Sequence, residues 1–297
     1  MLVARSADRR PRPTDAAVAA ALATVSPDRL RGLVEVLSFP RHYHADRRAN
    51  RRARDLLVQY LRGLGYEPTL HGSYDNVVAA TGGDGPALVL GAHYDSVPGT
   101  PGADDNASAV ATALECARLL KDAGAGPVRV VLFNREEDGL LGSTEYVEGL
   151  RAGEVTEAHV FEMVGFRTTA PKSQTMPPGL PGGLAPDVGD FLGLLANRHS
   201  NAVAEDLVRL AASYLPGFPV LALKMYLGVE KLVGHLHRSD HAPFWRAGLS
   251  ALMWTDTSEF RNPHYHQPTD TPDTLDYDFL ANVTRLALAR VLTRPAG

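Results

Sequence analysis

The feature that most constrains this fold is a series of short, continuously apolar segments separated by helix-like segments. The segments "PALVLGAHYDS" (86–96), "VRVVLFNREE" (128–137) and "AHVFEMVGF" (158–166) lack the alternation of a half-exposed strand. Strands that are apolar on both sides are typical of parallel sheets covered by helices on both faces. We therefore predict a three-layer α/β fold in which helices flank both faces of a mostly parallel, mixed sheet.

Weaker patterns complete the expected element order. Further strands are predicted at 76–81 and 249–256. Apolar residues at helical spacing predict helices over 16–38 (broken near Pro27), 45–65, 106–124, 140–153, 201–214 and 275–292.

We expect one catalytic domain over residues 16–297, because no repeat and no clear linker interrupts the pattern. Residues 1–15 are rich in Arg, Pro and Asp, and we expect them to be disordered. Residues 167–200 form a long Pro/Gly-rich excursion, and loops of this length are often the rims of functional sites.

Composition excludes several classes of protein. The net charge of −4 gives no basic field for nucleic acid, and no apolar run reaches the length of a membrane span. The only cysteine, Cys116, cannot form an intrachain disulfide, and we expect it in the core of a helix. The N-terminus lacks the apolar segment of a secretory signal, so we expect a cytoplasmic protein.

Acidic and imidazole side chains follow the predicted strands where those strands end. Because ligands gather at the carboxyl edge of a parallel sheet, we expect these residues to lie together: His93, Asp95, Asp104, Asp105, Glu136, Glu137, Glu162, His264 and His266. Mixed carboxylate and imidazole ligands suit Zn²⁺, and also Mn²⁺ or Co²⁺. Two histidines and three carboxylates can form two three-ligand sites if one carboxylate bridges, with a further carboxylate free to accept a proton.

The order of these motifs resembles the M28 family of zinc exopeptidases over about residues 70–290. The motifs are His-x-Asp, Gly-Ala-Asp-Asp-Asn-Ala-Ser, Glu-Glu-x-Gly-Leu-x-Gly-Ser, acid-Met-x-Gly and Tyr-His-x-x-x-Asp-Thr. The resemblance implies one zinc held by His93, Asp105 and Glu162, and a second held by Asp105, Glu137 and His266.

The resemblance also assigns roles beside the ligands. It implies that Glu136 is the general base, that Asp95 orients His93, and that the peptide bond between Asp105 and Asn106 is cis. One position departs from the family, which usually has Asp where this chain has Glu162.

Three nearby features have simpler readings. We expect Ser239 or Asp240 to cap a helix, with His241 facing the substrate or a ligand as the alternative. His264 is expected to have a structural or rim role. The aromatic residues Phe244, Trp245 and Trp254, with the 167–200 excursion, are expected to shape the substrate pocket.

The resemblance implies an aminopeptidase that acts on peptides. Alternatives are a glutaminyl cyclase with one zinc, the M20 peptidases, a hydrolase of acylated amino acids or small amides, and a relative that binds without catalysis. The chain has no segment long enough for the dimerisation domain usual in M20 peptidases, and all expected ligand positions hold competent residues. Side-chain preference and oligomeric state stay open.

Overall fold

The computed structural model describes residues 1–178, 180–228, 230 and 233–294. These residues form a nine-stranded sheet in the order β1-β8-β7-β9-β6-β4-β5-β3-β2. The strands are β1 (Leu2–Arg5), β2 (Thr69–His71), β3 (Asn76–Thr81), β4 (Ala87–His93), β5 (Val128–Phe133), β6 (Val155–Glu162), β7 (Leu192–Ala196), β8 (Val220–Lys224) and β9 (Ala251–Thr255).

Parallel pairing joins β5, β4, β6 and β9 at the centre of the sheet, and it also joins β7 to β8. The pairs β1/β8, β2/β3, β3/β5 and β7/β9 are antiparallel. Every residue of β4 is buried, as expected for a strand covered on both faces. The predicted α/β fold with a mixed sheet is confirmed.

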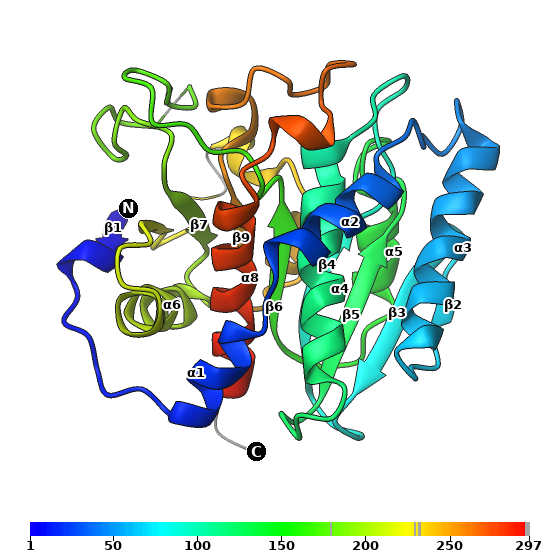
Figure 1. Ribbon diagram of the computed structural model, residues 1–297, viewed down its shortest axis with the longest axis horizontal. Helices are drawn as coiled ribbons and strands as arrows, with labels where there is room; N and C mark the ends of the chain where they lie inside the picture. The colour runs from blue at the N-terminus through cyan, green and yellow to red at the C-terminus, as the bar shows by residue number, and fades with distance from the viewer. Residues whose placement is uncertain (179, 229, 231–232, 295–297) are drawn as a thin grey trace.

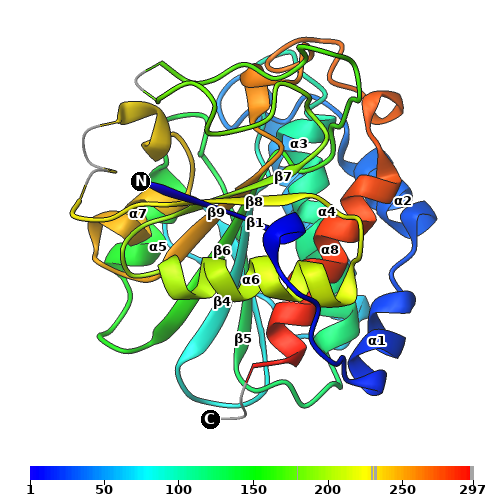
Figure 2. The ribbon, with the colours of Figure 1, turned by 90° about the vertical axis from the view of Figure 1, so that its left-hand side faces the viewer.

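Helices cover both faces of the sheet, which Figure 2 shows nearly edge-on. The helices are α1 (Ala16–Ala23), α2 (Pro27–Leu37), α3 (Arg47–Gly63), α4 (Ala109–Leu120), α5 (Leu141–Glu148), α6 (Asn201–Tyr214), α7 (His241–Arg246) and α8 (Tyr277–Leu292). One core cluster joins α2, α3, α4, α6 and α8 to the sheet, and a second joins α5 and α7 to the other face.

Local signals explain where helices begin. The break near Pro27 is present because the Ser26 hydroxyl caps α2 and Pro27 occupies its first turn. Asp276 caps α8 by accepting a hydrogen bond from the backbone N–H of Phe279 at 2.9 Å. No helix among the described residues is both long enough and apolar enough to cross a membrane.

The N-terminal segment differs from the expected disorder. Residues 2–5 form β1, which pairs with β8 at the edge of the sheet, and the Ser6 hydroxyl donates to the carbonyl of Phe218 at 3.0 Å. The composition of residues 1–15 suggested disorder, but an edge strand needs only a backbone partner, which β8 provides. β7 likewise lies within the predicted excursion, so the irregular part of that segment ends near residue 191.

Loops that follow the strands gather at the upper edge of Figure 1. The excursion that precedes β7 lies at the upper left and reaches over the side of the sheet formed by β7, β8 and β9. The peptide bond between Asp105 and Asn106 is cis, as predicted. The fold therefore places the excursion and the motif-bearing loops at one edge of the sheet.

Candidate metal centre

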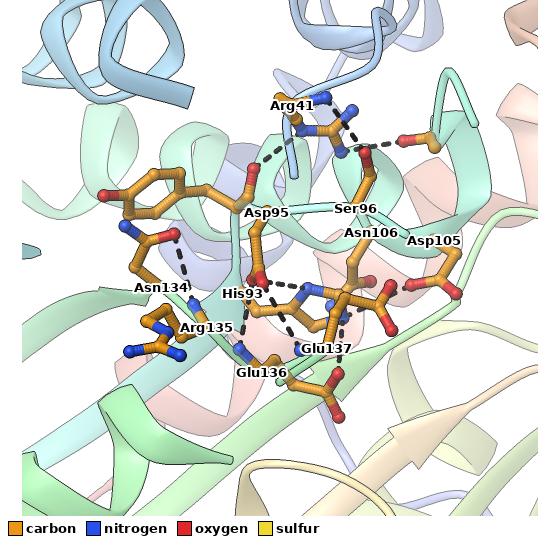
Figure 3. Close-up of polar contacts among 12 residues, drawn as sticks. Arg41, His93, Asp95, Ser96, Asp105, Asn106, Asn134, Arg135, Glu136 and Glu137 are labelled. Carbon is orange, nitrogen blue, oxygen red and sulfur yellow. Dashed lines mark hydrogen bonds and ion pairs between the residues drawn. The ribbon is translucent and has the colours of Figure 1, made fainter. Parts of the chain in front are cut away.

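Three parallel central strands deliver the first part of the site. β4 ends at His93, β6 ends at Glu162, and Glu136 and Glu137 follow β5 by three and four residues. Because these strands run in the same direction, their carboxyl ends bring the side chains together. Figure 3 shows His93, Glu136 and Glu137 converging with Asp105 from the loop after β4.

Asp105 lies between the two predicted histidine ligands. Its Oδ1 lies 3.3 Å from Nε2 of His93, and its Oδ2 lies 3.1 Å from Nε2 of His266. His266 Nε2 also lies 3.6 Å from Oε2 of Glu137. One carboxylate thus faces a different imidazole with each oxygen, which is the arrangement that a bridging ligand needs.

Two further acids approach the same nitrogen of His93. Oε2 of Glu162 lies 3.4 Å from His93 Nε2, and Oε2 of Glu136 lies 4.0 Å from the same atom. Two sets of three residues have ligand atoms that all lie within 4.8 Å of one another: His93, Asp105 and Glu137, and His93, Glu136 and Glu162. The structure therefore brings all the predicted ligands and the predicted base together. Neither set of three matches one of the two ligand sets that the family resemblance implies.

Buried atoms without partners show that the site suits a cation. His93 Nε2, Asp105 Oδ1 and Glu137 Oε1 are buried, and none has a hydrogen-bond partner among the described residues. Buried polar atoms are normally paired, and carboxylates in such a cluster repel one another. A divalent cation bound to imidazole and carboxylate atoms satisfies both requirements, and this ligand set fits zinc.

Asp95 connects two of the loops that carry the site. It is fully buried, and its Oδ1 lies 3.4 Å from Nδ1 of His93. Its two oxygens also accept hydrogen bonds from the backbone N–H groups of Glu136 and Glu137, at 3.2 and 3.3 Å. The structure thus places Asp95 where it can orient His93, and it adds a contact to the acidic pair that the sequence did not predict.

Two further side chains hold the Asp105 loop. Asp270 accepts hydrogen bonds from the backbone N–H groups of Asp104 and Asp105, at 2.8 and 3.1 Å. Asn106 donates to the carbonyl of Phe161 on β6 at 3.0 Å. Asp270 thus joins the loop of His266 to the loop that carries Asp105.

Arg41 is a buried cation beneath the same loop, and no sequence pattern pointed to it. Its guanidinium donates to five backbone carbonyls, those of Leu37, Phe39, Tyr94, Pro101 and Gly102. Figure 3 shows it beside Ser96, behind the metal-binding face of the loop. Arg41 therefore fixes both ends of the segment that leads from β4 to Asp105.

The expected helix cap is confirmed in position but not in its hydrogen bond. Asp240 occupies the N-cap position of α7, and its side chain makes no capping hydrogen bond. Ser239 is buried and donates to Oε2 of Glu162 at 2.5 Å. Glu162 is one methylene longer than the Asp usual in the family, and this extra reach brings it to Ser239. His241 makes no hydrogen bond with an acid of the cluster. Its Nε2 lies 2.7 Å from the carbonyl oxygen of Leu236.

Burial sets the protonation of several acids. Burial raises the pKa of Glu136 well above its usual range, and the charges of Glu137 and Glu162 raise it further. Burial also raises the pKa of Asp240, to about 7. For Asp105, the nearby imidazoles of His266 and His93 outweigh burial and hold the pKa below its usual range. The pKa values of Asp105 and Glu136 are therefore shifted in opposite directions.

Two other expectations agree with the structure. His264 does not join the cluster, because its Nδ1 lies 2.9 Å from the hydroxyl of Thr269. Cys116 is a buried free thiol in α4. Of the three aromatic residues expected at the substrate pocket, Trp245 lines a cavity beside the cluster, whereas Phe244 and Trp254 do not.

Known proteins resemble this chain in sequence. The model of Peptidase family M28 matches residues 76–212 and 222–291. The chain belongs to peptidase family M28. It is 35% identical over 232 residues to the uncharacterized protein YfbL of Escherichia coli, which covers 73% of this chain and 70% of YfbL. It is 33% identical over 207 residues to the aminopeptidase YwaD of Bacillus subtilis, and the match covers 67% of this chain and 39% of YwaD.

Solved structures of M28-like proteins share the fold. LapA aminopeptidase of Legionella pneumophila has a TM-score of 0.73 at 20% identity, covering 96% of this chain and 77% of LapA. BSAP, a zinc aminopeptidase of Bacillus subtilis, has a TM-score of 0.56 at 26% identity, covering 73% and 49% of the two chains. A glutaminyl cyclase of Bacteroides thetaiotaomicron has a TM-score of 0.70 at 16% identity, covering 91% and 98%. Membership of the M28 family confirms the expectation of a metallopeptidase.

Proposed function

We propose that this protein is an aminopeptidase that uses two zinc ions to hydrolyse the first amide bond of a peptide. The observation that carries the proposal is the placement of Asp105, whose two oxygens each face a different histidine. An aminopeptidase among the relatives at 33% identity supports the same activity.

Five residues would hold the metals. Asp105 would bridge, with His93 and Glu162 on one side and Glu137 and His266 on the other. When bound, two zinc ions lower the pKa of a water molecule and polarise the carbonyl oxygen of the substrate. The buried, unpartnered atoms of His93, Asp105 and Glu137 support this assignment.

Glu136 is the proposed general base. Its carboxylate lines the cavity beside the cluster, and its backbone N–H is fixed by Asp95. It accepts a proton from the attacking water and then donates that proton to the leaving nitrogen. A pKa raised by burial suits a group that must both take up and release a proton.

The same end of the cavity suits the free α-amine of a peptide. Four carboxylates line it, and an ammonium group is favoured beside them: Asp105, Glu136, Glu137 and Glu162.

Metal content and substrate turnover test the proposal together. We expect two zinc ions per chain by inductively coupled plasma mass spectrometry, and turnover of alanine and leucine p-nitroanilides that is lost on chelation and restored by zinc. One zinc per chain, no nitroanilide turnover and release of ammonia from a peptide with an N-terminal Gln would overturn it in favour of a cyclase.

A further inference from the structure

A cavity of about 960 Å³ opens beside the metal centre. At one end it is lined by the predicted base and four of the predicted ligands: Asp105, Glu136, Glu137, Glu162 and His266. From there it extends along the sheet towards β7 and β8. The cavity and the acidic cluster are therefore one continuous space.

The sheet supplies one apolar wall of this cavity. Leu195 on β7, Leu221 and Leu223 on β8 and Met253 on β9 line it. Side chains alternate along a strand, so the neighbours Leu194 and Ala222 point the other way and join the core beneath α6 and α8. The sheet thus presents a second apolar face where β7, β8 and β9 meet, and part of this face lines the cavity.

The Pro/Gly-rich excursion supplies the opposite wall. Met176, Pro177, Leu180 and Leu184 line the cavity from the excursion, and Trp245 lines it from α7. Leu180 and Leu184 pack against the same core cluster as α5 and α7. The excursion covers the apolar sheet face while leaving a space between the two.

Two arginines that line the cavity are engaged within the protein. The Arg238 guanidinium donates to Glu259 and to the hydroxyl of Tyr265, the latter at 2.9 Å. Arg246 donates to the carbonyl of Ala242 at 3.3 Å. Glu230 also lines the cavity, and its buried Oε2 has no hydrogen-bond partner among the described residues. The wall formed by Leu195, Leu221 and Leu223 carries no charge and favours an apolar occupant.

The size of the cavity exceeds the needs of one amino-acid side chain. A cavity of about 150 Å³ holds a benzene molecule, and pockets of roughly 300–1,000 Å³ hold drug-sized ligands. A leucine or phenylalanine side chain would leave most of the 960 Å³ unfilled. In an exopeptidase the cleaved residue is the end of the substrate and can be enclosed, whereas the leaving chain must reach solvent.

We propose that this cavity binds a long apolar chain on the acyl side of the scissile amide, longer than any standard amino-acid side chain. The inference rests on the proposed function, because it places the scissile amide at the acidic end of the cavity. The substrate class is then amides of α-amino acids with extended alkyl or aryl-alkyl side chains. The competing occupant of the cavity is a leaving chain that begins with several consecutive apolar residues.

A homologous series of substrates tests the inference. We would measure kcat/KM for p-nitroanilides of linear 2-amino acids with side chains of one to eight carbons. Each methylene that leaves water contributes about fourfold, so we expect kcat/KM to keep rising beyond the four carbons of norleucine. A matched series of alanine amides with lengthening apolar leaving groups tests the competing arrangement, in which the apolar group lies on the leaving side of the scissile amide.

Variants connect the effect to the cavity. Leu195→Trp narrows the cavity between β7 and the excursion, and we expect it to lower the ratio of eight-carbon to one-carbon kcat/KM at least tenfold. Leu195→Phe is a smaller change for use if the first variant does not fold. Leu227→Trp is the control, since Leu227 is 97% exposed and does not line the cavity.

The outcomes separate this inference from the proposed function. Turnover of the alanine substrate with a plateau at four carbons, or a rise only in the leaving-group series, would overturn the inference and keep the aminopeptidase. With no turnover of any substrate the aminopeptidase fails, and calorimetry with n-octylamine and n-butylamine then tests the cavity directly. Equal affinity for the two amines would overturn the inference, and tighter binding of octylamine that Leu195→Trp weakens would support it.

Discussion

The two ends of the cavity are built from different kinds of contact. At the metal end, Asp95 and Asp270 accept hydrogen bonds from backbone N–H groups of the loops that carry the ligands. At the other end, Leu195 and Leu223 meet an excursion that contributes mainly apolar contacts. Directional bonds fix atoms to within tenths of an ångström, whereas apolar contacts tolerate changes of shape. In the proposed function, the metal end carries the chemistry and the apolar end carries the selectivity.

The largest effect on kcat should come from a substitution at the metal end that leaves the zinc content unchanged. We expect Glu136→Gln to lower kcat by roughly 10²- to 10⁴-fold, because the amide cannot accept the proton from water. Zinc content and melting temperature should stay unchanged. Glu148→Gln, on the exposed side of α5, is the matched control. Loss of zinc from Glu136→Gln would show that Glu136 is a ligand instead.

A smaller effect, a loss of zinc affinity, is expected when Asp95 no longer connects the loops that carry the ligands. Asn in place of Asp95 presents an NH₂ group where two backbone N–H groups and His93 need acceptors. We expect Asp95→Asn to weaken zinc binding about 10- to 100-fold, measured by competition with a chelator of known affinity. Asp84→Asn, in an exposed turn, should bind zinc like the parent protein. Unchanged affinity in Asp95→Asn would refute a role for Asp95 in orienting His93.

Ser239 tests whether Glu162 depends on a partner outside the usual pattern. A hydrogen bond to a side chain of this kind contributes about 0.5–1.5 kcal/mol, so Ser239→Ala should lower kcat/KM about 2- to 12-fold. Asp at position 162 is too short to keep the contact with Ser239. In the Glu162→Asp background, the Ser239→Ala substitution should therefore have almost no further effect. Additive losses in the double variant would contradict the proposed coupling.

The smallest effect should come from a histidine two residues from a ligand. His264 contacts Thr269 and lies outside the cluster, so we expect His264→Ala to keep kcat/KM within about twofold. His266→Ala is the contrasting variant, and it should lose zinc from one site along with most activity. A loss in His264→Ala as large as that in His266→Ala would place both rings in the metal centre.

The sequence predicted the metal end better than the apolar end for a physical reason. His93, Glu136 and Glu162 follow strands whose apolar runs are visible in the sequence, and parallel strands bring their ends together. β1, β7 and β8 are only four or five residues long, so no periodicity identifies them. The cavity wall depends on β7 and β8, and it was predicted only through the excursion that covers it and through Trp245.

Contacts between distant segments account for the residues that were missed. Ser239 carries a hydroxyl that suits a helix cap, and only the tertiary fold shows that it reaches Glu162 instead. Asp270 lies within a motif that resembles the family, but its two hydrogen bonds join loops more than 160 residues apart. Such pairings have no local sequence pattern, because they depend on where complete elements pack.

Arg41 has a consequence for the limits of the catalytic unit. Every predicted ligand and the predicted base lie within the residues that match the family, which begin at residue 76. Arg41 lies outside that match, yet its guanidinium binds the carbonyls of Tyr94, Pro101 and Gly102 inside it. A fragment that starts at residue 76 would keep the whole motif set and leave these carbonyls without their donor. The segment that holds the Asp105 loop in place therefore extends at least to Arg41, beyond the boundary drawn by the motifs.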